Sequence, residues 1–385
     1  MKYRLKDIFD LQMGKTPSRN NRDYWNNEGY KWISIADLSK TDKYISKTKE
    51  YLSRSAIEES GIKVIPANTV IMSFKLSIGK VAITSEDMYS NEAIMAFRDK
   101  HIVDILPEYI FYMFMHRKWD EVGNKAVMGK TLNKAILSDV EIDVSPIEEQ
   151  KKIVKILDRL MNVLEYRKEE LESLDDIIKA RFVEMFGDAI HNDKGWETDE
   201  VEKLCKEIYG GGTPSKLHSE YYEDGDIPWI SSKDMKTDVL TDSQIKINQL
   251  GVDNSTARMV PINSVIMVIR SGILKHTLPV AINAVPITVN QDLKVFIPNE
   301  RVLTRFLAVQ FKMHEKDILS GVRVVTADNI EFNSLKQRKL IVPPIELQQE
   351  YVSFVEQTDK SKVAVQKALD EAQLLFDSLM QEYFG

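Results

Sequence analysis

Gly14-Lys15-Thr16-Pro17-Ser18, followed by Tyr24-Trp25 and Trp32-Ile33-Ser34, opens a series of motifs that occurs twice in this chain. The second series reads Gly211-Gly212-Thr213-Pro214-Ser215, Tyr221-Tyr222 and Trp229-Ile230-Ser231. Each motif of the second series follows its counterpart by 197 residues, as position 211 follows position 14. A constant spacing of this kind indicates an internal duplication.

The duplication extends over nearly the whole chain of 385 residues. A repeat of this length greatly exceeds the roughly 20–50 residues of solenoid and propeller repeats, so each copy is expected to be a domain with an appendage. The later counterparts are Pro66–Met72 and Pro261–Met267, Val81–Ile83 and Val280–Ile282, Met115-His116 and Met313-His314, Pro146–Glu148 and Pro344–Glu346, and Phe186-Gly187 and Phe384-Gly385.

Each appendage is predicted to be a long helix. Pro146 and Pro344 stand where a helix can begin, and about 40 residues without Pro follow each of them. Apolar residues of the first segment recur at alternating steps of four and three, which is a coiled-coil pattern. One such stripe is equally typical of an ordinary packed helix, but two stripes at equivalent places favour an antiparallel pair. The residues predicted to pack between the helices are Leu157, Leu160, Leu164, Leu171, Leu174, Ile178, Val355, Leu369, Phe376 and Met380.

The rest of each copy has the pattern of mixed α and β structure. Turn residues separate β-type runs such as Val70–Phe74, and Pro107 begins a helix with the aromatic stretch Tyr109–Phe114. A base-stacking surface is one interpretation of that stretch, but a buried helix face is favoured. The predicted fold class is α+β, with two similar globular mixed α/β domains (1–146 and 188–344) separated by two long helices (147–187 and 345–385) that form an antiparallel coiled coil.

The composition excludes several classes of protein. A hydrophobic content of 43% can fill real cores, which excludes a disordered chain. Charged residues make up 29% of the chain, and no apolar run approaches roughly 18 residues, so no membrane span is expected. The N-terminus lacks the pattern of a secretory signal, and the single Cys205 cannot form an intramolecular disulfide, so a cytoplasmic location is expected.

The net charge of −7, from 52 Lys and Arg against 59 Asp and Glu, argues at first against a nucleic-acid partner. The two helical segments hold all of this excess, because together they carry 11 basic and 18 acidic residues. The two domains are therefore balanced in charge and can present basic loops. The acidic helices suit protein partners.

Motifs for catalysis are lacking. Gly129-Lys130-Thr131 ends like a phosphate-binding loop, but Asn124 stands where the first Gly of that loop belongs. The chain's Pro343-Pro344 follows Val342 and precedes Ile345, so it is not the Asn/Asp/Ser-Pro-Pro-Tyr/Phe motif with which amino-methyltransferases hold a base. The six His and one Cys show no metal-ligand spacing. We therefore expect a binding protein without catalytic or metal-ligating residues.

The duplicated series resembles the specificity subunit of a type I restriction-modification system. Gly212–Ser215, Tyr221-Tyr222, Ile227–Ser231 and Asp234 carry the resemblance, together with Pro146-Ile147-Glu148-Glu149-Gln150 and its counterpart Pro344–Gln348. The resemblance covers the whole chain and implies two target recognition domains, each of which reads one half of a bipartite site in double-stranded DNA.

The resemblance also implies the partners. Its two helices would act as a ruler, and 40 helical residues span roughly 60 Å, more than one turn of duplex. They would also dock two methyltransferase subunits, and two ATP-dependent translocase-nuclease subunits would complete the enzyme. S-adenosylmethionine, ATP and magnesium are then expected on the partner subunits, and no cofactor is expected on this chain.

Candidate DNA-contacting residues are cations and short polar side chains in turn-rich stretches, where they can reach phosphates or base edges. Any one of them is also typical of a solvated surface or a structural turn, and Gly-Thr-Pro-Ser in particular can be a turn beside Trp32 and Trp229. The candidates are Lys15, Thr16, Ser18, Arg19, Arg22, Lys75, Ser77, Lys80, Lys125, Lys130 and Asn133 in the first domain, and Thr213, Ser215, Lys216, Arg270, Ser271, Lys275, His276 and Arg323 in the second.

The candidate loops differ most between the copies, which predicts two different half-sites and an asymmetric target. Residues 75–80 have no close match in 270–279, and Asn91–Ala93 differ from Asn290–Asp292. Two alternatives remain: a non-catalytic coiled-coil adaptor without sequence-specific DNA reading, and the specificity subunit of a defence assembly that methylates but does not cleave.

Overall fold

The computed structural model describes all residues except 27, 76, 123–131 and 325–327. The chain divides into two compact units, Met1–Lys168 with Gln366–Gly385 (unit 1) and Glu169–Val365 (unit 2). Two long helices, α6 (Ile147–Phe186) and α12 (Ile345–Phe384), contribute a part to each unit. We refer to residues 1–146 as head 1 and to residues 188–344 as head 2.

Head 1 contains a five-stranded sheet in the order β2-β10-β7-β8-β5, a four-stranded sheet β3-β6-β4-β9 and the pair β1-β11. Its strands are β1 (Lys2–Arg4), β2 (Phe9–Met13), β3 (Trp25–Asn26), β4 (Tyr30–Ile33), β5 (Tyr44–Ile45), β6 (Glu50–Leu52), β7 (Val70–Ser73), β8 (Val81–Thr84), β9 (Tyr89–Ser90), β10 (Ile94–Asp99) and β11 (Glu141–Asp143). Its helices are α1 (Leu5–Ile8), α2 (Ile35–Leu38), α3 (Arg54–Ser60), α4 (Pro107–His116) and α5 (Lys134–Ser138), with 3₁₀ turns η1 (Arg22–Tyr24) and η2 (Trp119–Glu121).

Head 2 repeats this plan with a five-stranded sheet β13-β20-β17-β18-β15, a three-stranded sheet β16-β14-β19 and the pairs β12-β23 and β21-β22. Its strands are β12 (Thr198–Glu200), β13 (Cys205–Gly210), β14 (Ile227–Ile230), β15 (Val239–Leu240), β16 (Lys246–Ile247), β17 (Val265–Val268), β18 (Val280–Asn283), β19 (Thr288–Val289), β20 (Leu293–Pro298), β21 (Arg323–Val324), β22 (Asp328–Asn329) and β23 (Lys339–Ile341). Its helices are α7 (Val201–Leu204), α8 (Gln249–Asp253), α9 (Thr304–Met313), α10 (Glu315–Ser320) and α11 (Phe332–Lys336), with 3₁₀ turns η3 (Ser219–Tyr221) and η4 (Gly272–Lys275).

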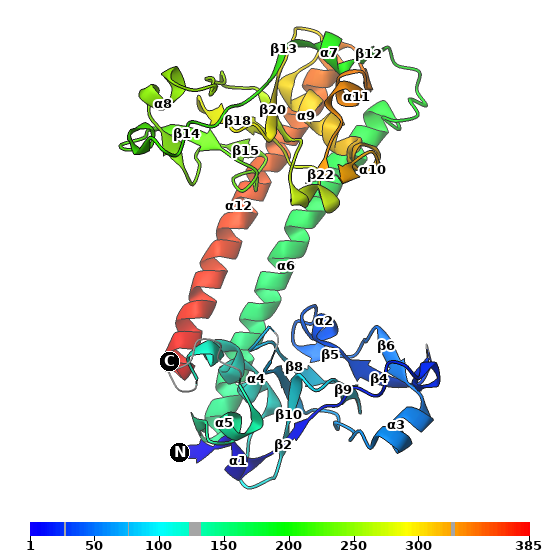
Figure 1. The fold of residues 1–385 in the computed structure, drawn as a ribbon, viewed down its shortest axis with the longest axis vertical. Helices are drawn as coiled ribbons and strands as arrows, with labels where there is room; N and C mark the ends of the chain where they lie inside the picture. Colours follow the sequence, from blue (N-terminus) through cyan, green and yellow to red (C-terminus); the bar gives the residue numbers. More distant parts are fainter. Residues whose placement is uncertain (27, 76, 123–131, 325–327) are drawn as a thin grey trace. The chain divides into compact units, whose positions relative to one another are not determined.

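The five-stranded sheet of head 1 is apolar on both faces, which explains the continuous apolar runs in its strands. Along β10, Met95 and Phe97 belong to one buried cluster, while Ile94 and Ala96 belong to another. Successive side chains of a strand point to opposite faces, so an unbroken run buries both. Helix α4 covers the first face (Figure 1). Its residues Tyr109–Phe114 are all buried there. The buried-face interpretation of this aromatic stretch is confirmed.

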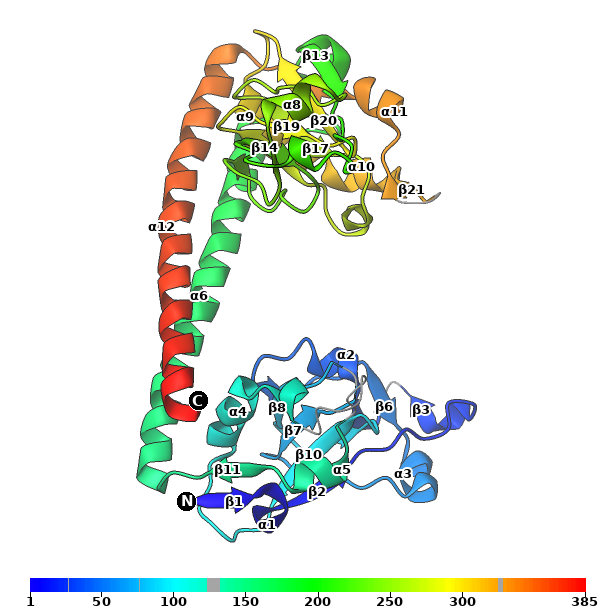
Figure 2. The ribbon, with the colours of Figure 1, turned by 60° about the vertical axis from the view of Figure 1, so that its left-hand side comes forward.

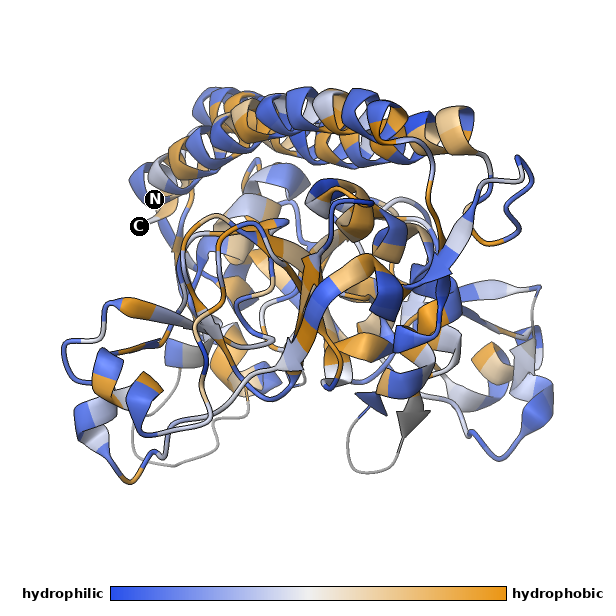
Figure 3. Cartoon of the chain, turned by 90° about the horizontal axis from the view of Figure 1, so that it is seen from above, coloured by the Kyte–Doolittle hydropathy of each residue, from blue (hydrophilic) through white to orange (hydrophobic). Residues whose placement is uncertain are grey.

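The long helices complete the core of each unit. Leu157, Leu164, Phe376 and Met380 lie in the cluster under α4 in unit 1, and Ile178 and Val355 lie in the main cluster of unit 2. Figure 2 shows the two helices side by side, and Figure 3 shows hydrophobic residues recurring among hydrophilic ones along them. The remaining predicted packing residues, Leu160, Leu171, Leu174 and Leu369, are half-buried.

The two helices run antiparallel. In unit 2, Asp175 of α6 pairs with Lys362 of α12, whereas the later Arg181 pairs with the earlier Glu350 at 2.8 Å. The Tyr351 hydroxyl donates a hydrogen bond to the Ile178 carbonyl at 3.0 Å. Two similar mixed domains with two long antiparallel helices confirm the predicted fold class.

A buried glutamine ties the start of each long helix to its head. The Oε1 atom of Gln150 accepts from the Leu106 amide at 2.9 Å, and its Nε2 atom donates to the carbonyls of Asp104 and Ser145. Gln348 makes the same three bonds, to the Leu303 amide and to the carbonyls of Arg301 and Pro343. Both side chains are fully buried, so the Pro-Ile-Glu-x-Gln motif is explained by this connection.

The substitution Gln348→Ala is expected to lower the free energy of unfolding by about 2–4 kcal/mol, because it leaves buried amide and carbonyl groups without partners. Gln349→Ala, at the exposed neighbouring position, is the matched control and should change stability by less than about 0.5 kcal/mol. Urea unfolding followed by circular dichroism measures both. Equal stability of the two variants would contradict the structural role of Gln348.

Candidate nucleic-acid interface

Three loops of head 1 leave the same edge of its five-stranded sheet. Strand β2 ends at Met13 opposite Met95, near the start of β10, while β7 ends at Ser73 opposite Ile94. Because the neighbours are antiparallel, the end of one strand lies beside the start of the next. The loops 14–21, 74–80 and 91–93 therefore gather at one edge.

The same edge of head 2 gathers the equivalent loops. Gly210 at the end of β13 is opposite Lys294, and Val268 at the end of β17 is opposite Leu293. The loops 211–218, 269–279 and 290–292 consequently lie together. In each head, the candidate residues of the first two loops are far apart in the sequence, but the fold brings them to one edge of the sheet.

Glycine and tryptophan hold the Gly-Thr-Pro-Ser loop in place. A Cβ atom on Gly14 would lie 2.2 Å from the Asn91 carbonyl oxygen, and one on Gly211 would lie 1.8 Å from the Val289 carbonyl oxygen. The indole nitrogen of Trp32 donates to the Lys15 carbonyl at 3.1 Å, and that of Trp229 donates to the Gly212 carbonyl at 3.0 Å. The repeated glycine and tryptophan therefore have a structural role.

The threonine of each loop contacts the third loop. The Thr16 hydroxyl donates to the Glu92 carboxylate, and the Thr213 hydroxyl donates to the side-chain oxygen of Gln291. The hydrogen bond from Thr16 holds the pKa of Glu92 below its usual range, against the effect of burial. The two edges thus have the same frame, but an anion in head 1 stands where head 2 has a neutral amide.

Two predicted cations of head 1 are engaged within the head. The Lys15 ammonium donates to the Ser60 carbonyl at 2.5 Å. The Arg19 guanidinium forms two hydrogen bonds with Glu50 and stacks on Trp25, 3.7 Å from the ring centre. These contacts orient both side chains, and a phosphate would have to compete with them. Arg22 and Ser18 are exposed.

The loop between β7 and β8 presents two exposed lysines, and hydrogen bonds from Ser73 join its described ends. The Ser73 hydroxyl donates to the Ser77 carbonyl at 2.6 Å and accepts from the Lys80 amide at 3.0 Å. Ser77 itself has a positive φ of 47°. Lys75 and Lys80 are exposed, and within the described residues neither forms an ion pair.

The equivalent loop of head 2 has different contacts. Arg270 pairs with Asp292 of the third loop at 2.5 Å, and Lys275 lies 3.7 Å from the buried Asp328. The Ser271 hydroxyl accepts from the Ile273 amide at the start of η4, and the Ser271 amide donates to the Asp328 carbonyl at 3.1 Å. His276 is exposed. Arg323 lies in β21 opposite Asn329, which forms a β-bridge with Arg270, so the fold brings Arg323 to the same place.

The remaining candidates are less constrained. Ser215 and Lys216 are exposed, whereas Asn133 accepts from the Ile136 amide at the start of α5. Lys125 and Lys130 fall outside the described residues. Sequence reasoning missed Leu217, which is 95% exposed beside Lys216, and it did not assign roles to Glu92 and Gln291. For Glu92 and Gln291, the one signal in the sequence was that Asn91–Ala93 differ from Asn290–Asp292.

The chemistry of this edge suits recognition. Amide, hydroxyl, carboxylate and cationic groups alternate there, and these are the groups that read base edges and hold phosphates. Over the described part of the chain, no group of three His, Cys, Asp or Glu side chains could hold a metal ion. Nor is any described helix long and apolar enough to cross a membrane.

Comparison with known proteins identifies the family. The family described as type I restriction modification DNA specificity domain matches residues 1–175 and again 193–372, so this chain belongs to it. The MjaIX specificity subunit of Methanocaldococcus jannaschii is 25% identical over 98% of this chain and 90% of its own length. The EcoR124I/EcoR124II specificity subunit of Escherichia coli is 38% identical over 39% of this chain and 38% of its own length.

Solved structures agree on the fold. The S subunit of a type I restriction-modification system from M. genitalium aligns over 100% of this chain and 96% of its own, with a TM-score of 0.57 and 14% identity. A chain from a structural study of complex assembly and conformational transition of the type I R-M system aligns with the same TM-score and 16% identity, over 100% of this chain and 97% of its own. These two structures show the fold, and the family match shows that the chain is of the type I specificity-subunit class.

The substitution Gly211→Ala is expected to lower the free energy of unfolding by about 1–3 kcal/mol, because its Cβ has no room beside the backbone of Val289. Gly272→Ala in the same head is the control, since a Cβ there meets no atom within 4 Å. Thermal unfolding of both variants gives the comparison, and an undisturbed Gly211→Ala variant would show that the close approach is not needed.

Proposed function

We propose that this chain is the DNA-recognition subunit of a type I restriction-modification complex. Each head reads one half of an asymmetric bipartite site in double-stranded DNA, through the three loops at the edge of its five-stranded sheet. The helices set the spacing between the halves and dock the methyltransferase subunits. The observation that carries the proposal is this repeated edge, with one frame and different side chains in the two heads.

Differences at equivalent positions support an asymmetric target. The frame residues Gly14 and Gly211 make the same close approaches. The charged residues of the second loop differ. Within the described residues Lys75 and Lys80 of head 1 form no ion pair, whereas Arg270 and Lys275 of head 2 pair with Asp292 and Asp328. Since donors and acceptors at base edges determine which base is accepted, two different edges favour two different sequences.

Exposed apolar residues on the helices support a docking role. Ile177 of α6 is 47% exposed, and its counterpart Leu375 of α12 is 50% exposed. In unit 2, Ile177, Ala180 and Phe354 line a groove of about 530 Å³ together with Arg181 and Glu184. Apolar positions with a charged rim are typical of protein interfaces. We propose that each of the two equivalent positions contacts one methyltransferase subunit.

The chain itself has no catalytic role in this proposal. Two methyltransferase subunits bring S-adenosylmethionine, and two translocase-nuclease subunits bring ATP and magnesium. This chain binds none of these cofactors, and the complex acts in the cytoplasm on foreign DNA.

Co-expression with the methyltransferase of the same system tests the reading of DNA. Single-molecule sequencing of the host genome should show modified adenines in a split motif with a fixed gap. Lys75→Ala together with Lys80→Ala should relax or abolish the half of the motif read by head 1. For the purified complex, a plot of the logarithm of the binding constant against the logarithm of salt concentration has a negative slope. The magnitude of that slope should decrease by about 2 if both lysines contact phosphates.

Lys40→Ala together with Lys47→Ala is the matched control, because both lysines are exposed on head 1 but lie outside the three loops. This pair should leave the motif and the salt slope unchanged. A palindromic motif would refute the asymmetric target. A folded complex without any modification would favour the adaptor interpretation instead.

Leu375→Glu should reduce the number of methyltransferase subunits bound per chain from two to one, because a carboxylate replaces the exposed apolar side chain. Gln373→Glu adds the same charge on another face of α12 and should bind two. Native mass spectrometry or light scattering counts the subunits. Unaltered binding by Leu375→Glu would place the docking surface elsewhere.

A further inference from the structure

The joint between each head and its helices has charged residues whose signs differ between the units. The first position directly precedes β5 or β15. The Ile83 amide donates to the Lys43 carbonyl at 2.8 Å, and the Ile282 amide donates to the Asp238 carbonyl at 2.9 Å. Lys43 and Asp238 therefore occupy the same place in their heads. Head 1 has a cation where head 2 has an anion.

The second and third positions lie on α4 and α9. Leu106 and Leu303 directly precede these helices, and their amides donate to Gln150 and Gln348. Counting from these two leucines, Glu108 corresponds to Arg305, and Met115 corresponds to Lys312. The structure thus shifts by one residue the sequence match of Met115-His116 with Met313-His314, because α4 and α9 start 197 residues apart. Head 1 thus has an anion and an apolar residue where head 2 has two cations.

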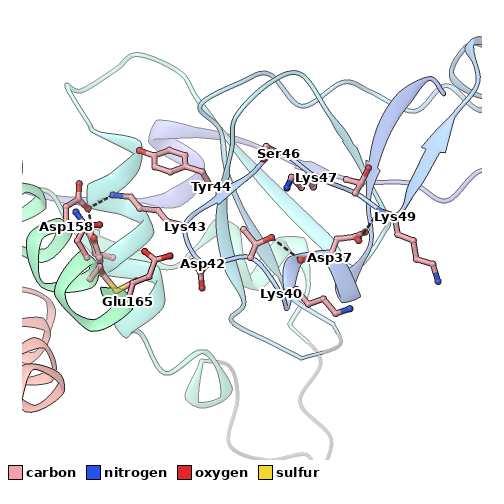
Figure 4. Close-up of a pocket in the computed structure, with 15 residues that line it drawn as sticks. Asp37, Lys40, Asp42, Lys43, Tyr44, Ser46, Lys47, Lys49, Asp158 and Glu165 are labelled. Atoms are coloured by element: carbon pink, nitrogen blue, oxygen red, sulfur yellow. Dashed lines mark hydrogen bonds and ion pairs between the residues drawn. The ribbon is translucent and has the colours of Figure 1, made fainter. Parts of the chain in front are cut away.

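In unit 1, Lys43 of the head forms an ion pair with Asp158 of α6 (Figure 4). The Lys43 side chain is only 14% exposed, and the Tyr112 hydroxyl donates to the same carboxylate. The Tyr44 hydroxyl donates to Glu108 at 2.7 Å. Lys43, Tyr44 and Asp158 line a cleft of about 730 Å³ between residues 37–49 and α6. The head supplies the cation here, and the helix supplies the anion.

In unit 2 the head supplies an anion at the first position, where Asp238 pairs with Lys312 of its own head and also faces a cation of α12. Lys362 of α12 lies 3.8 Å from Asp238 of the head and pairs with Asp175 of α6 at 2.7 Å. Burial would raise the pKa of Asp238, but Lys312, Lys362 and Arg305 together lower it. Arg305 of the head, whose side chain is 14% exposed, pairs with Asp359 of α12.

A head in the other head's place would meet the wrong charges. Gln150 and Gln348 bring α6 and α12 into a common register, in which Asp158 corresponds to Glu356, Met161 to Asp359 and Leu164 to Lys362. The first of these helix positions is anionic in both units, so the helices differ in charge at the second and third. Head 1 on the helices of unit 2 would direct Glu108 toward Asp359 and Lys43 toward Lys362. Head 2 on the helices of unit 1 would direct Asp238 toward Asp158. It would also leave Arg305 facing Met161.

Half-buried charges without partners are costly, because water screens them little and no longer solvates them fully. A duplicated chain has a particular need for this discrimination, since similar domains can dock on one another's partners during folding. The two heads share the strand order of their five-stranded sheets, and the charged side chains at this joint differ between them in sign.

We infer that each head is keyed to its own section of the helical pair by this reversed charge pattern, so that the two heads cannot exchange places. Lys43, Glu108 and Met115 form the key of head 1, and Asp238, Arg305 and Lys312 form the key of head 2. The partner of each interface is the chain's own helices. The inference does not depend on DNA reading, and its test measures stability alone.

Four full-length chains test this inference. They combine the natural or the exchanged order of residues 1–146 and 188–344 with the natural or the exchanged key. The exchanged key consists of the six substitutions Lys43→Asp, Glu108→Arg, Met115→Lys, Asp238→Lys, Arg305→Glu and Lys312→Met. Melting temperature and the fraction of soluble chain are measured for each.

The exchanged order with the natural key is expected to melt at least about 5 °C below the parent. The exchanged key should restore most of this loss in the exchanged order and should destabilise the natural order by a similar amount. If both chains with the exchanged order aggregate, the chain that has the natural order and the exchanged key tests the inference by itself. The inference is overturned if that chain has the same melting temperature as the parent. It is also overturned if exchanging the heads lowers the melting temperature equally with either key.

Discussion

The structure depends on the burial of helical side chains under each head. The apolar face of the five-stranded sheet in head 1 is covered by α4, and Leu157 and Leu164 of α6 join Phe376 and Met380 of α12 in the same cluster. A head without its helices would expose much of this surface to water, at a cost of about 25 cal/mol for each Å². Gln150 and Gln348 then determine where each helix starts relative to its head, since their buried amides leave no alternative position. Domain and helix are in this sense one folding unit.

The edge at which the three loops meet, proposed as the recognition site, follows from the arrangement of the sheet. Antiparallel neighbours bring the ends of β2 and β7 and the start of β10 together, so loops that are distant in the sequence become adjacent. Loops can vary at such an edge because the sheet beneath them is fully packed on both faces. The Gly-Thr-Pro-Ser motif turns out to belong mainly to the frame, with Trp32 and Trp229 as its anchors. The residues that differ, such as Glu92 and Gln291, lie on the neighbouring loop.

The two halves of this protein are alike in backbone and different in charge. At the recognition edge, different charges give the heads different partners in DNA under the proposed function. At the joint with the helices, Lys43 and Asp238 occupy one place with opposite signs, and each faces a helical residue of opposite charge, Asp158 or Lys362, at a different helix position. A duplication that keeps its frame can thus diverge at both surfaces through a few side chains, because exposed and half-buried charges change binding without repacking the core.

The sequence by itself determined the duplication, the fold class and the two long helices, because spacing, apolar periodicity and the positions of Pro and Gly are local properties of the chain. It also pointed to the loops that differ between the copies. Only the tertiary structure decided which candidates share an edge and which are engaged elsewhere, as Arg19 is with Glu50 and Trp25. It likewise decided how Lys362 is accommodated between the buried Val355 and Val365 of α12, since it pairs with Asp175 and lies 3.8 Å from Asp238. These are contacts between residues far apart in the sequence, and no local pattern of residue types encodes such a pairing.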